Sequence, residues 1–331
     1  MQMLIKEKYQ KINILEKQKL IKLIKDNFEQ QLAEKLNLIR VSAPLVVTKE
    51  SGLQDDLSGK ERKVSFDLKD GKCLEIVQSL AKWKRYALKQ YQIPLHHGLY
   101  TDMMAIRRDE VLDNTHSLYV DQWDWEKVIT NDDRNFAYLK ETVKKIVKAI
   151  IKTAKYLSET GFKTNELEEN VYFITTEELL KMYPNLTSKE REYQIVKDHK
   201  TVFIMEIGDI LSNGVCHDER APDYDDWHLN GDLFFYHEVL DMALEISSMG
   251  IRVNKESLLS ELKKSHHEER LNYLYHQMIV NEELPLSIGG GIGQSRLCML
   301  LLNRAHIGEV QSSYWDDKNI KYCLENEIEL L

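Results

Sequence analysis

Residues 287–302 hold the group of residues that is best suited to bind a nucleotide. This stretch reads SIGGGIGQSRLCMLLL, with glycine at four of the five positions from Gly289 to Gly293, followed by Arg296. A backbone without Cβ atoms can approach a flat or charged group very closely. The leucine-rich run predicts a buried helix, whose positive N-terminal end lies beside Arg296. The combination favours a site for a nucleotide phosphate or base. The simpler alternative is a glycine-rich strand packed beneath a helix.

Two common nucleotide-binding patterns do not fit this stretch. The third glycine of G-x-G-x-x-G has no counterpart, and no lysine follows the glycines as it would in a Walker A loop. The sequence GGGIGQSRL instead resembles the third signature motif of class II aminoacyl-tRNA synthetases. In that motif a glycine-rich strand leads to an arginine that lies against ATP, which implies this role for Arg296.

The composition is that of an ordinary globular protein, with 43% hydrophobic and 30% charged residues in a chain of 331. The formal net charge of −9 disfavours a nucleic-acid backbone as the main partner. No apolar run approaches the length of a membrane span and the first residues lack a signal-peptide pattern, so we expect a cytoplasmic protein. The four scattered cysteines form no C-x-x-C pair, which favours reduced, mostly buried thiols.

Two earlier stretches resemble the other class II motifs. Apolar residues at helical spacing across residues 5–38 predict a long amphipathic helix, in one or two pieces. A strand interrupted by Pro44 follows, and this order resembles the first motif, which builds a dimer interface. Residues 98–107 and 116–128 predict an antiparallel hairpin with Arg107 at the start of its loop. This arrangement resembles the second motif, whose arginine holds the α-phosphate and the carboxylate being activated.

The other predicted elements indicate an α+β domain. Strands are expected at residues 63–68, 73–77, 171–175, 201–207, 233–236 and 242–246, and helices at 132–160, from 188, and within 255–280. A helix that begins near Ser79 carries three cations in its N-terminal half, Lys82, Lys84 and Arg85. Positive charge there opposes the helix dipole, so these side chains are either solvated or face an anion. The acidic stretch HDERAPDYDDW is either a solvated loop or, because aromatic residues interleave with the acids, a pocket wall. No repeat or linker divides the chain, which predicts one catalytic domain over residues 1–331.

Several stretches, taken in order, carry a more specific resemblance: LVVTKESGLQDDLSG, SLAKWKR, GLYTDMMAIR, LYVDQWDWE, RAPDYDDW, LNGDLFFY, LEISSMGIRV and IGGGIGQSRL. Together they resemble the ammonia-dependent asparagine synthetases, or aspartate–ammonia ligases. This resemblance implies a class II-like α+β core with a mostly antiparallel sheet flanked by helices. It also implies a homodimer, ATP as co-substrate, and a β-aspartyl-adenylate that ammonia attacks. One departure is the stretch between Trp227 and Asn230, which is shorter than in that family. The resemblance therefore does not determine the geometry of a local lid there.

The resemblance also implies roles for individual residues. Arg107 would bridge the β-carboxylate and the α-phosphate, while Arg296 would bind the adenine and the γ-phosphate. Glu245 begins the stretch EISS, which resembles the strand that holds Mg²⁺ in aspartyl-tRNA synthetases, so Asp232 and Glu245 are the expected metal ligands. The remaining residues expected at ATP are Arg220 and Gly293.

The α-ammonium group of aspartate and the incoming ammonium are both cations, so acids must receive them. The candidates are Asp55, Asp124 and Asp225, and either one of these acids or the departing phosphate takes the proton that ammonium loses. Further residues expected at the substrate are Lys84, Asp121, Gln122, Ser247, Ser248, Arg252, Gly290 and Gly291. Two other functions remain open, an adenylate-forming paralogue of the aminoacyl-tRNA synthetases and a non-catalytic paralogue that binds amino acid or nucleotide.

Overall fold

The computed structural model describes residues 1–55, 57 and 61–331. Its main element is an eight-stranded sheet in the order β1-β5-β6-β11-β10-β9-β8-β7. Neighbouring strands are antiparallel except at the two edges, where the pairs β1–β5 and β7–β8 are parallel. The strands are β1 (Leu38–Arg40), β5 (Gly98–Ile106), β6 (Tyr119–Val128), β7 (Tyr172–Thr175), β8 (Thr201–Met205), β9 (Asp225–His237), β10 (Met242–Arg252) and β11 (Ser287–Gly293). The predicted α+β class with a mostly antiparallel sheet is confirmed.

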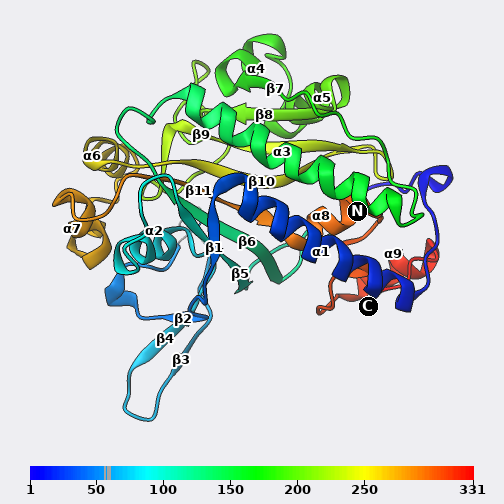
Figure 1. Cartoon of the computed structure of the whole chain (residues 1–331), viewed down its shortest axis with the longest axis horizontal. Helices are drawn as coiled ribbons and strands as arrows, with labels where there is room; N and C mark the ends of the chain where they lie inside the picture. Colours follow the sequence, from blue (N-terminus) through cyan, green and yellow to red (C-terminus); the bar gives the residue numbers. More distant parts are fainter. Residues whose placement is uncertain (56, 58–60) are drawn as a thin grey trace.

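The two longest helices, α1 and α3, lie side by side across one face of this sheet (Figure 1). Each begins at an asparagine whose side chain accepts a hydrogen bond from the first turn, Asn13 for α1 and Asn135 for α3. The helices are α1 (Ile14–Leu36), α2 (Ala81–Gln90), α3 (Phe136–Glu159), α4 (Thr176–Met182), α5 (Ser188–His199), α6 (Lys255–Lys264), α7 (Leu274–Val280), α8 (Gln294–Leu301) and α9 (Asp317–Glu325). Short 3₁₀ turns are η1 (Lys6–Lys8), η2 (Lys49–Ser51), η3 (Glu268–Asn272) and η4 (Ile307–Glu309).

The alternation of residues along β6 separates the core from the opposite face of the sheet. Trp123 and Trp125 are fully buried in the same hydrophobic cluster as α1 and α3, and the ring of Trp123 lies 4.7 Å from that of Phe28. Because successive side chains of a strand point to opposite faces, the intervening Asp124 and Glu126 point away from these helices. The hydrophobic packing of α1 and α3 therefore leaves a polar face on the other side of β6.

A smaller sheet projects from the body of the molecule. It consists of β2 (Val46–Val47), β4 (Cys73–Ile76) and β3 (Ser65–Asp67), in the order β2-β4-β3. The hairpin formed by β3 and β4 extends away from the main sheet (Figure 1).

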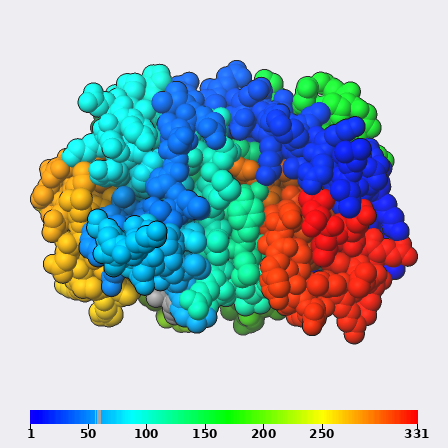
Figure 2. Space-filling view, turned by 90° about the horizontal axis from the view of Figure 1, so that it is seen from below, coloured from blue at the N-terminus to red at the C-terminus, as the bar shows by residue number. Residues whose placement is uncertain are grey.

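The two ends of the chain lie against each other. Figure 2 shows the C-terminal segment beside the N-terminal residues on one face of the molecule. Lys17 in α1 donates a hydrogen bond of 2.9 Å to the carbonyl of Glu329, and the buried Arg304 donates one of 2.6 Å to the carbonyl of Gln10. None of the helices in the described part of the chain has the length and apolarity that crossing a bilayer requires.

The sequence predictions differ from the structure mainly at the ends of elements. The predicted helix over residues 5–38 begins only at Ile14, and Pro44 lies between β1 and β2 rather than within one strand. Proline lacks the N–H that a ladder needs, and the chain moves there from the large sheet to the small one. The strand expected at 233–236 is the end of the longer β9, so the prediction of a loop before it was wrong from Asp225 onward. Helices α4 and α9 were not predicted.

Candidate active site

A cavity of about 520 Å³ lies on the polar face of the sheet. Strands β6, β9, β10 and β11 form its floor, and the loops before α2, between β5 and β6, and before β9 form its walls. Of the residues predicted for the site, all except Ser247 and Asp232 line this cavity. Strands, loops and helices far apart in the sequence therefore bring these predicted residues together.

The glycine-rich strand β11 runs between β6 and β10 and faces the side chains of both. A Cβ atom on Gly291 would lie 2.6 Å from Oδ1 of Asp124, and one on Gly290 would lie 2.5 Å from Cβ of Met249 on the other face. Gly289, which was not predicted, leaves room for the carboxylate of Glu126. These glycines are therefore needed for close approach, because any side chain would displace the polar groups of the neighbouring strand.

Two arginines from separate motifs line the cavity. Arg107 follows β5, and its buried Nε has no hydrogen-bond partner among the described residues, while its guanidinium lies 3.9 Å from Glu110. Arg296 lies in the first turn of α8 and donates a hydrogen bond of 3.2 Å to the carbonyl of Glu245. Both guanidinium groups can reorient toward an anion, because neither forms a close ion pair with a carboxylate.

The two predicted metal ligands lie on neighbouring strands. Glu245 lines the cavity, whereas Asp232 is not part of the lining and forms an ion pair with Arg220, which does line it. Burial raises the pKa of Asp232 to about 7, with Arg220 opposing the rise and Glu245 adding to it. Burial also disfavours ionisation of Glu245, but Arg296 and Arg220 lower its pKa below the usual range. The described residues contain no cluster of three or more potential metal ligands, so this pair offers two carboxylates.

The three cations near the N-terminus of α2, Lys82, Lys84 and Arg85, are buried and bound, which settles the alternative that the sequence left open. Lys84 donates a hydrogen bond of 2.8 Å to the carbonyl of Gly290 and lies 3.4 Å from Oδ1 of Asp124. Lys82 forms an ion pair of 2.7 Å with the buried Asp223. These cations therefore face anions and carbonyl groups instead of solvent, and burial lowers the pKa of Lys84.

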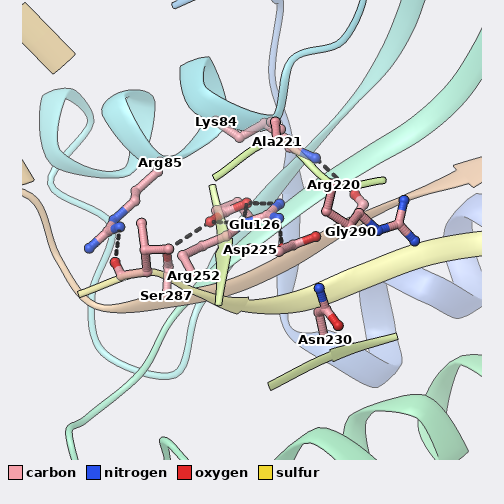
Figure 3. A network of polar contacts seen from close by, with 12 residues as sticks. Lys84, Arg85, Glu126, Arg220, Ala221, Asp225, Asn230, Arg252, Ser287 and Gly290 are labelled. Atoms are coloured by element: carbon pink, nitrogen blue, oxygen red, sulfur yellow. Dashed lines mark hydrogen bonds and ion pairs between the residues drawn. The ribbon is translucent and has the colours of Figure 1, made fainter. Parts of the chain in front are cut away.

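A network of buried charges supports the floor of the cavity (Figure 3). Arg252 donates hydrogen bonds to both carboxylate oxygens of Glu126, the shortest 2.7 Å, and also binds Asp225. Ser287 donates a hydrogen bond of 2.7 Å to the same Glu126. Sequence analysis missed Glu126, although its spacing of two residues from Asp124 and four from Gln122 indicates the same face of a strand. Arg252 is thus held by two carboxylates of the protein.

The remaining predicted residues occupy different environments. Asp55 is buried, accepts a hydrogen bond from Ser79, and has a pKa that burial raises against the effect of Lys82. Asp121 accepts hydrogen bonds from Lys25 at 3.0 Å and from the N–H of Ser295 at 3.1 Å, so it supports the N-terminus of α8.

The serines of the EISS stretch face different ways. Ser248 lines the cavity, whereas the buried Oγ of Ser247 has no hydrogen-bond partner among the described residues and lies outside the lining. The alternation of side chains along β10 separates these neighbours. Gln122 lines the cavity, and Gly293, Gln294 and Arg296 begin the segment that closes one end of it.

The fold is that of the class II aminoacyl-tRNA synthetases. An asparaginyl-tRNA synthetase from Entamoeba histolytica, in complex with asparaginyl-adenylate, superposes with a TM-score of 0.68 at 14% sequence identity. The match covers 92% of this chain and 68% of that one. The corresponding enzyme from Pyrococcus horikoshii gives a TM-score of 0.66 at 13% identity, covering 91% of this chain and 70% of that one.

Closer relatives share most of the sequence. An aspartate–ammonia ligase from Clostridium tetani is 56% identical over 314 residues, which cover 94% of this chain and 92% of that protein. One from Ligilactobacillus salivarius is 53% identical over 328 residues, 97% of each chain. A family model described as aspartate-ammonia ligase matches residues 15–327. With this match over nearly its whole length, the chain belongs to the aspartate–ammonia ligase family.

Proposed function

We propose that the protein makes asparagine from aspartate and ammonia, consuming ATP and releasing AMP and pyrophosphate through a β-aspartyl-adenylate. The observation that carries this proposal is the convergence of Arg107, Arg296 and buried acids in one cavity of a chain that belongs to the aspartate–ammonia ligase family. A carboxylate is a poor acyl donor because its oxygen cannot leave. Attack of a carboxylate oxygen on the α-phosphorus of ATP forms a new P–O bond, breaks the bond to pyrophosphate and gives the β-aspartyl-adenylate, from which AMP is a good leaving group.

Both reactants of the first step are anionic, so the site must supply positive charge that is already in place. Arg107 suits the α-phosphate and the β-carboxylate, because its buried Nε has no protein partner among the described residues. Arg296 suits the other end of ATP, because it lies at the N-terminus of α8, where the helix dipole adds positive charge. Lys84 lies beside Asp124 and could clamp the substrate carboxylate.

The carboxylates of Asp232 and Glu245 are oxygen ligands of the kind that Mg²⁺ prefers, and Mg²⁺ needs few of them when phosphates and water complete its shell. Burial is the main cause of the raised pKa of Asp232, and the nearby carboxylate of Glu245 adds to it. We therefore expect these two residues to hold Mg²⁺, which would neutralise phosphate charge when bound. Arg220, now paired with Asp232, would then turn toward the nucleotide.

In the second step the ammonia nitrogen attacks the acyl carbon of the adenylate. A C–N bond forms, the C–O bond to AMP breaks, and one N–H proton must leave. Asp55 is the acid best suited to accept that proton, because it lines the cavity and burial raises its pKa, which strengthens it as a base. Burial also raises the pKa of Asp225, but that carboxylate is bound by Arg252. Asp124 and Asp225 would hold the α-ammonium group of aspartate.

The order of events gives the test. Adenylation needs only ATP, Mg²⁺ and aspartate, so aspartate should support exchange of labelled pyrophosphate into ATP without ammonia or tRNA. Oxygen-18 in the β-carboxylate should appear in AMP once ammonium is added, together with asparagine. ADP as the nucleotide product, with the label in inorganic phosphate, would refute the proposal. Adenylate formation without asparagine would instead indicate a paralogue of the aminoacyl-tRNA synthetases, and no reaction at all would indicate a binding protein.

We also propose a cytoplasmic homodimer in which each chain is one catalytic domain. The parallel pair β1–β5 forms an edge of the large sheet, and apolar side chains on and beside it are exposed: Ile39, Leu45 and Met104. An exposed apolar edge of this kind suits pairing with a second copy. Light scattering should give twice the chain mass of 38.9 kDa, and a monomer at micromolar concentration would contradict it.

A further inference from the structure

A second, much smaller pocket of about 20 Å³ lies directly behind one wall of the main cavity. Gln54 and Lys82 line this pocket, whereas their neighbours in the sequence, Asp55 and Ala81, line the main cavity. Lys82 donates a hydrogen bond of 3.0 Å to the carbonyl of Gln54, which joins the two segments of the wall. A volume of this size accommodates one molecule as small as water or ammonia.

Two buried acceptor atoms on the side chains that line the pocket have no hydrogen-bond partner among the described residues: Nδ1 of His276, and Oε2 of Glu75, which forms a long ion pair of 3.8 Å with Lys63. His276 is fully buried and its Nε2 lies 2.9 Å from Oδ2 of Asp223. Because Nε2 faces a carboxylate oxygen, it is the ring nitrogen that donates, and Nδ1 is the acceptor of the neutral ring. Burial favours the neutral ring by lowering the pKa of His276, although Asp223 opposes this shift. A buried acceptor without a hydrogen-bond donor is costly. A small ligand that carries N–H or O–H groups would satisfy Nδ1 of His276 and add a hydrogen bond to Oε2 of Glu75, whose charge Lys63 already offsets in part.

The charge around the pocket selects against a cation. Basic side chains dominate its lining, namely Lys49, Lys63, Lys82 and Arg270, against the single carboxylate of Glu75. The nearby Asp223 is already bound by Lys82, Arg270 and His276. An ammonium ion would be repelled here, whereas neutral ammonia can donate to both acceptors and accept a hydrogen bond from a lysine.

We propose that this pocket binds one molecule of neutral ammonia and holds it next to Asp55, on the route to the adenylate. The inference rests on the proposed function, because a protein that makes no asparagine would have no use for such a site. The competing occupant is a structural water, which fits the same acceptors but would not affect the kinetics of ammonia.

The test compares Glu75→Gln and His276→Gln with the wild type. Glu75→Gln replaces one acceptor oxygen by a donor NH₂ group, and His276→Gln replaces the fixed ring acceptor Nδ1 by a flexible amide. The control Glu283→Gln removes an exposed carboxylate that pairs with Lys89 outside the pocket. The measurements are the KM for ammonia, the KM for aspartate, the rate of pyrophosphate exchange without ammonia, and the melting temperature. Loss of one hydrogen bond should raise the KM for ammonia about five- to tenfold and leave the KM for aspartate and the exchange rate unchanged. The control should match the wild type in all four.

Several results would overturn the assignment. An unchanged KM for ammonia in both folded variants would leave only a structural water, and a parallel fall in pyrophosphate exchange would mean that the pocket acts on adenylation. Thallium(I), a cation similar in size to ammonium, should not occupy the pocket in soaked crystals, and an anomalous peak there would disprove selection of the neutral form. Failure of the wild type to catalyse aspartate-dependent exchange would refute the proposed function itself, separately from the comparison of variants.

Discussion

Replacement of Arg107 by alanine tests the central element of the mechanism. The side chain has a buried Nε without a partner among the described residues, and its ion pair with Glu110 is long, at 3.9 Å, and partly exposed. Such a pair contributes at most about 1 kcal/mol to stability, which corresponds to a change in melting temperature of no more than about 4 °C. In contrast, removing one preorganised charge from the transition state typically lowers the rate by about 10²- to 10³-fold. The variant should therefore fold normally and lose adenylation.

The assay is aspartate-dependent exchange of pyrophosphate into ATP, combined with thermal unfolding. Arg108→Ala provides a matched control, because Arg108 is the next residue, is exposed and does not line the cavity. It should exchange at the wild-type rate. Exchange by Arg107→Ala within about threefold of the wild type would refute the role assigned to this arginine, since a threefold change is far below the effect expected for a lost transition-state charge. A large fall in melting temperature would also refute the reasoning, by showing that the side chain is structural.

Four further predictions follow from other sites. Arg252→Ala should lower the free energy of unfolding by about 3–5 kcal/mol, because it leaves two buried carboxylates without a cation. Denaturant unfolding measures this change, and a loss below about 1 kcal/mol would contradict the stabilising role of the buried charge network. Asp232→Asn and Glu245→Gln should each raise the Mg²⁺ concentration needed for half-maximal exchange, and an unchanged Mg²⁺ dependence would count against metal ligation. Burial raises the pKa of Glu261 from 4.5 to about 10, so the folded state binds the extra proton and stability falls as the pH rises between these values. Glu261→Gln lacks this loss and should gain stability over the wild type as the pH increases from 5 to 9, and a constant difference in melting temperature would disprove the shift. Glutamine should not replace ammonia as the nitrogen donor, because hydrolysis of glutamine needs a nucleophile such as cysteine. All four cysteines are in the described part of the chain, and none lines the cavity. Asparagine formed from glutamine, in an ammonia-free preparation, as fast as from ammonia would contradict this prediction.

The sequence alone was sufficient for the parts of the fold that depend on local pattern. The 3.6-residue spacing of apolar residues predicted α3, and the two-residue alternation predicted β5 and β6 with their antiparallel pairing. The four glycines before Arg296 marked the strand and helix that carry it, because few other arrangements require so many positions without a Cβ. These signals are short-range. The resemblance to the aspartate–ammonia ligases supplied most of the site residues, and all of the predicted site residues except Ser247 and Asp232 line one cavity.

Only the tertiary structure decided how the charges are paired. Nothing in the sequence around Arg252 indicates that Glu126, 126 positions away, and Asp225, 27 positions away, hold it on both sides. The same limit explains why Lys82, Lys84 and Arg85 could be read as solvated, although burial against carboxylates and carbonyls fixes them. Strand β9 extends to Asp225 for a related reason, since pairing with β10 overrides the low strand propensity of its aspartates. Several of these pairings join residues more than a hundred positions apart, as do Arg252 with Glu126 and Lys82 with Asp223. Which partners meet depends on how the sheet assembles, which no local pattern specifies.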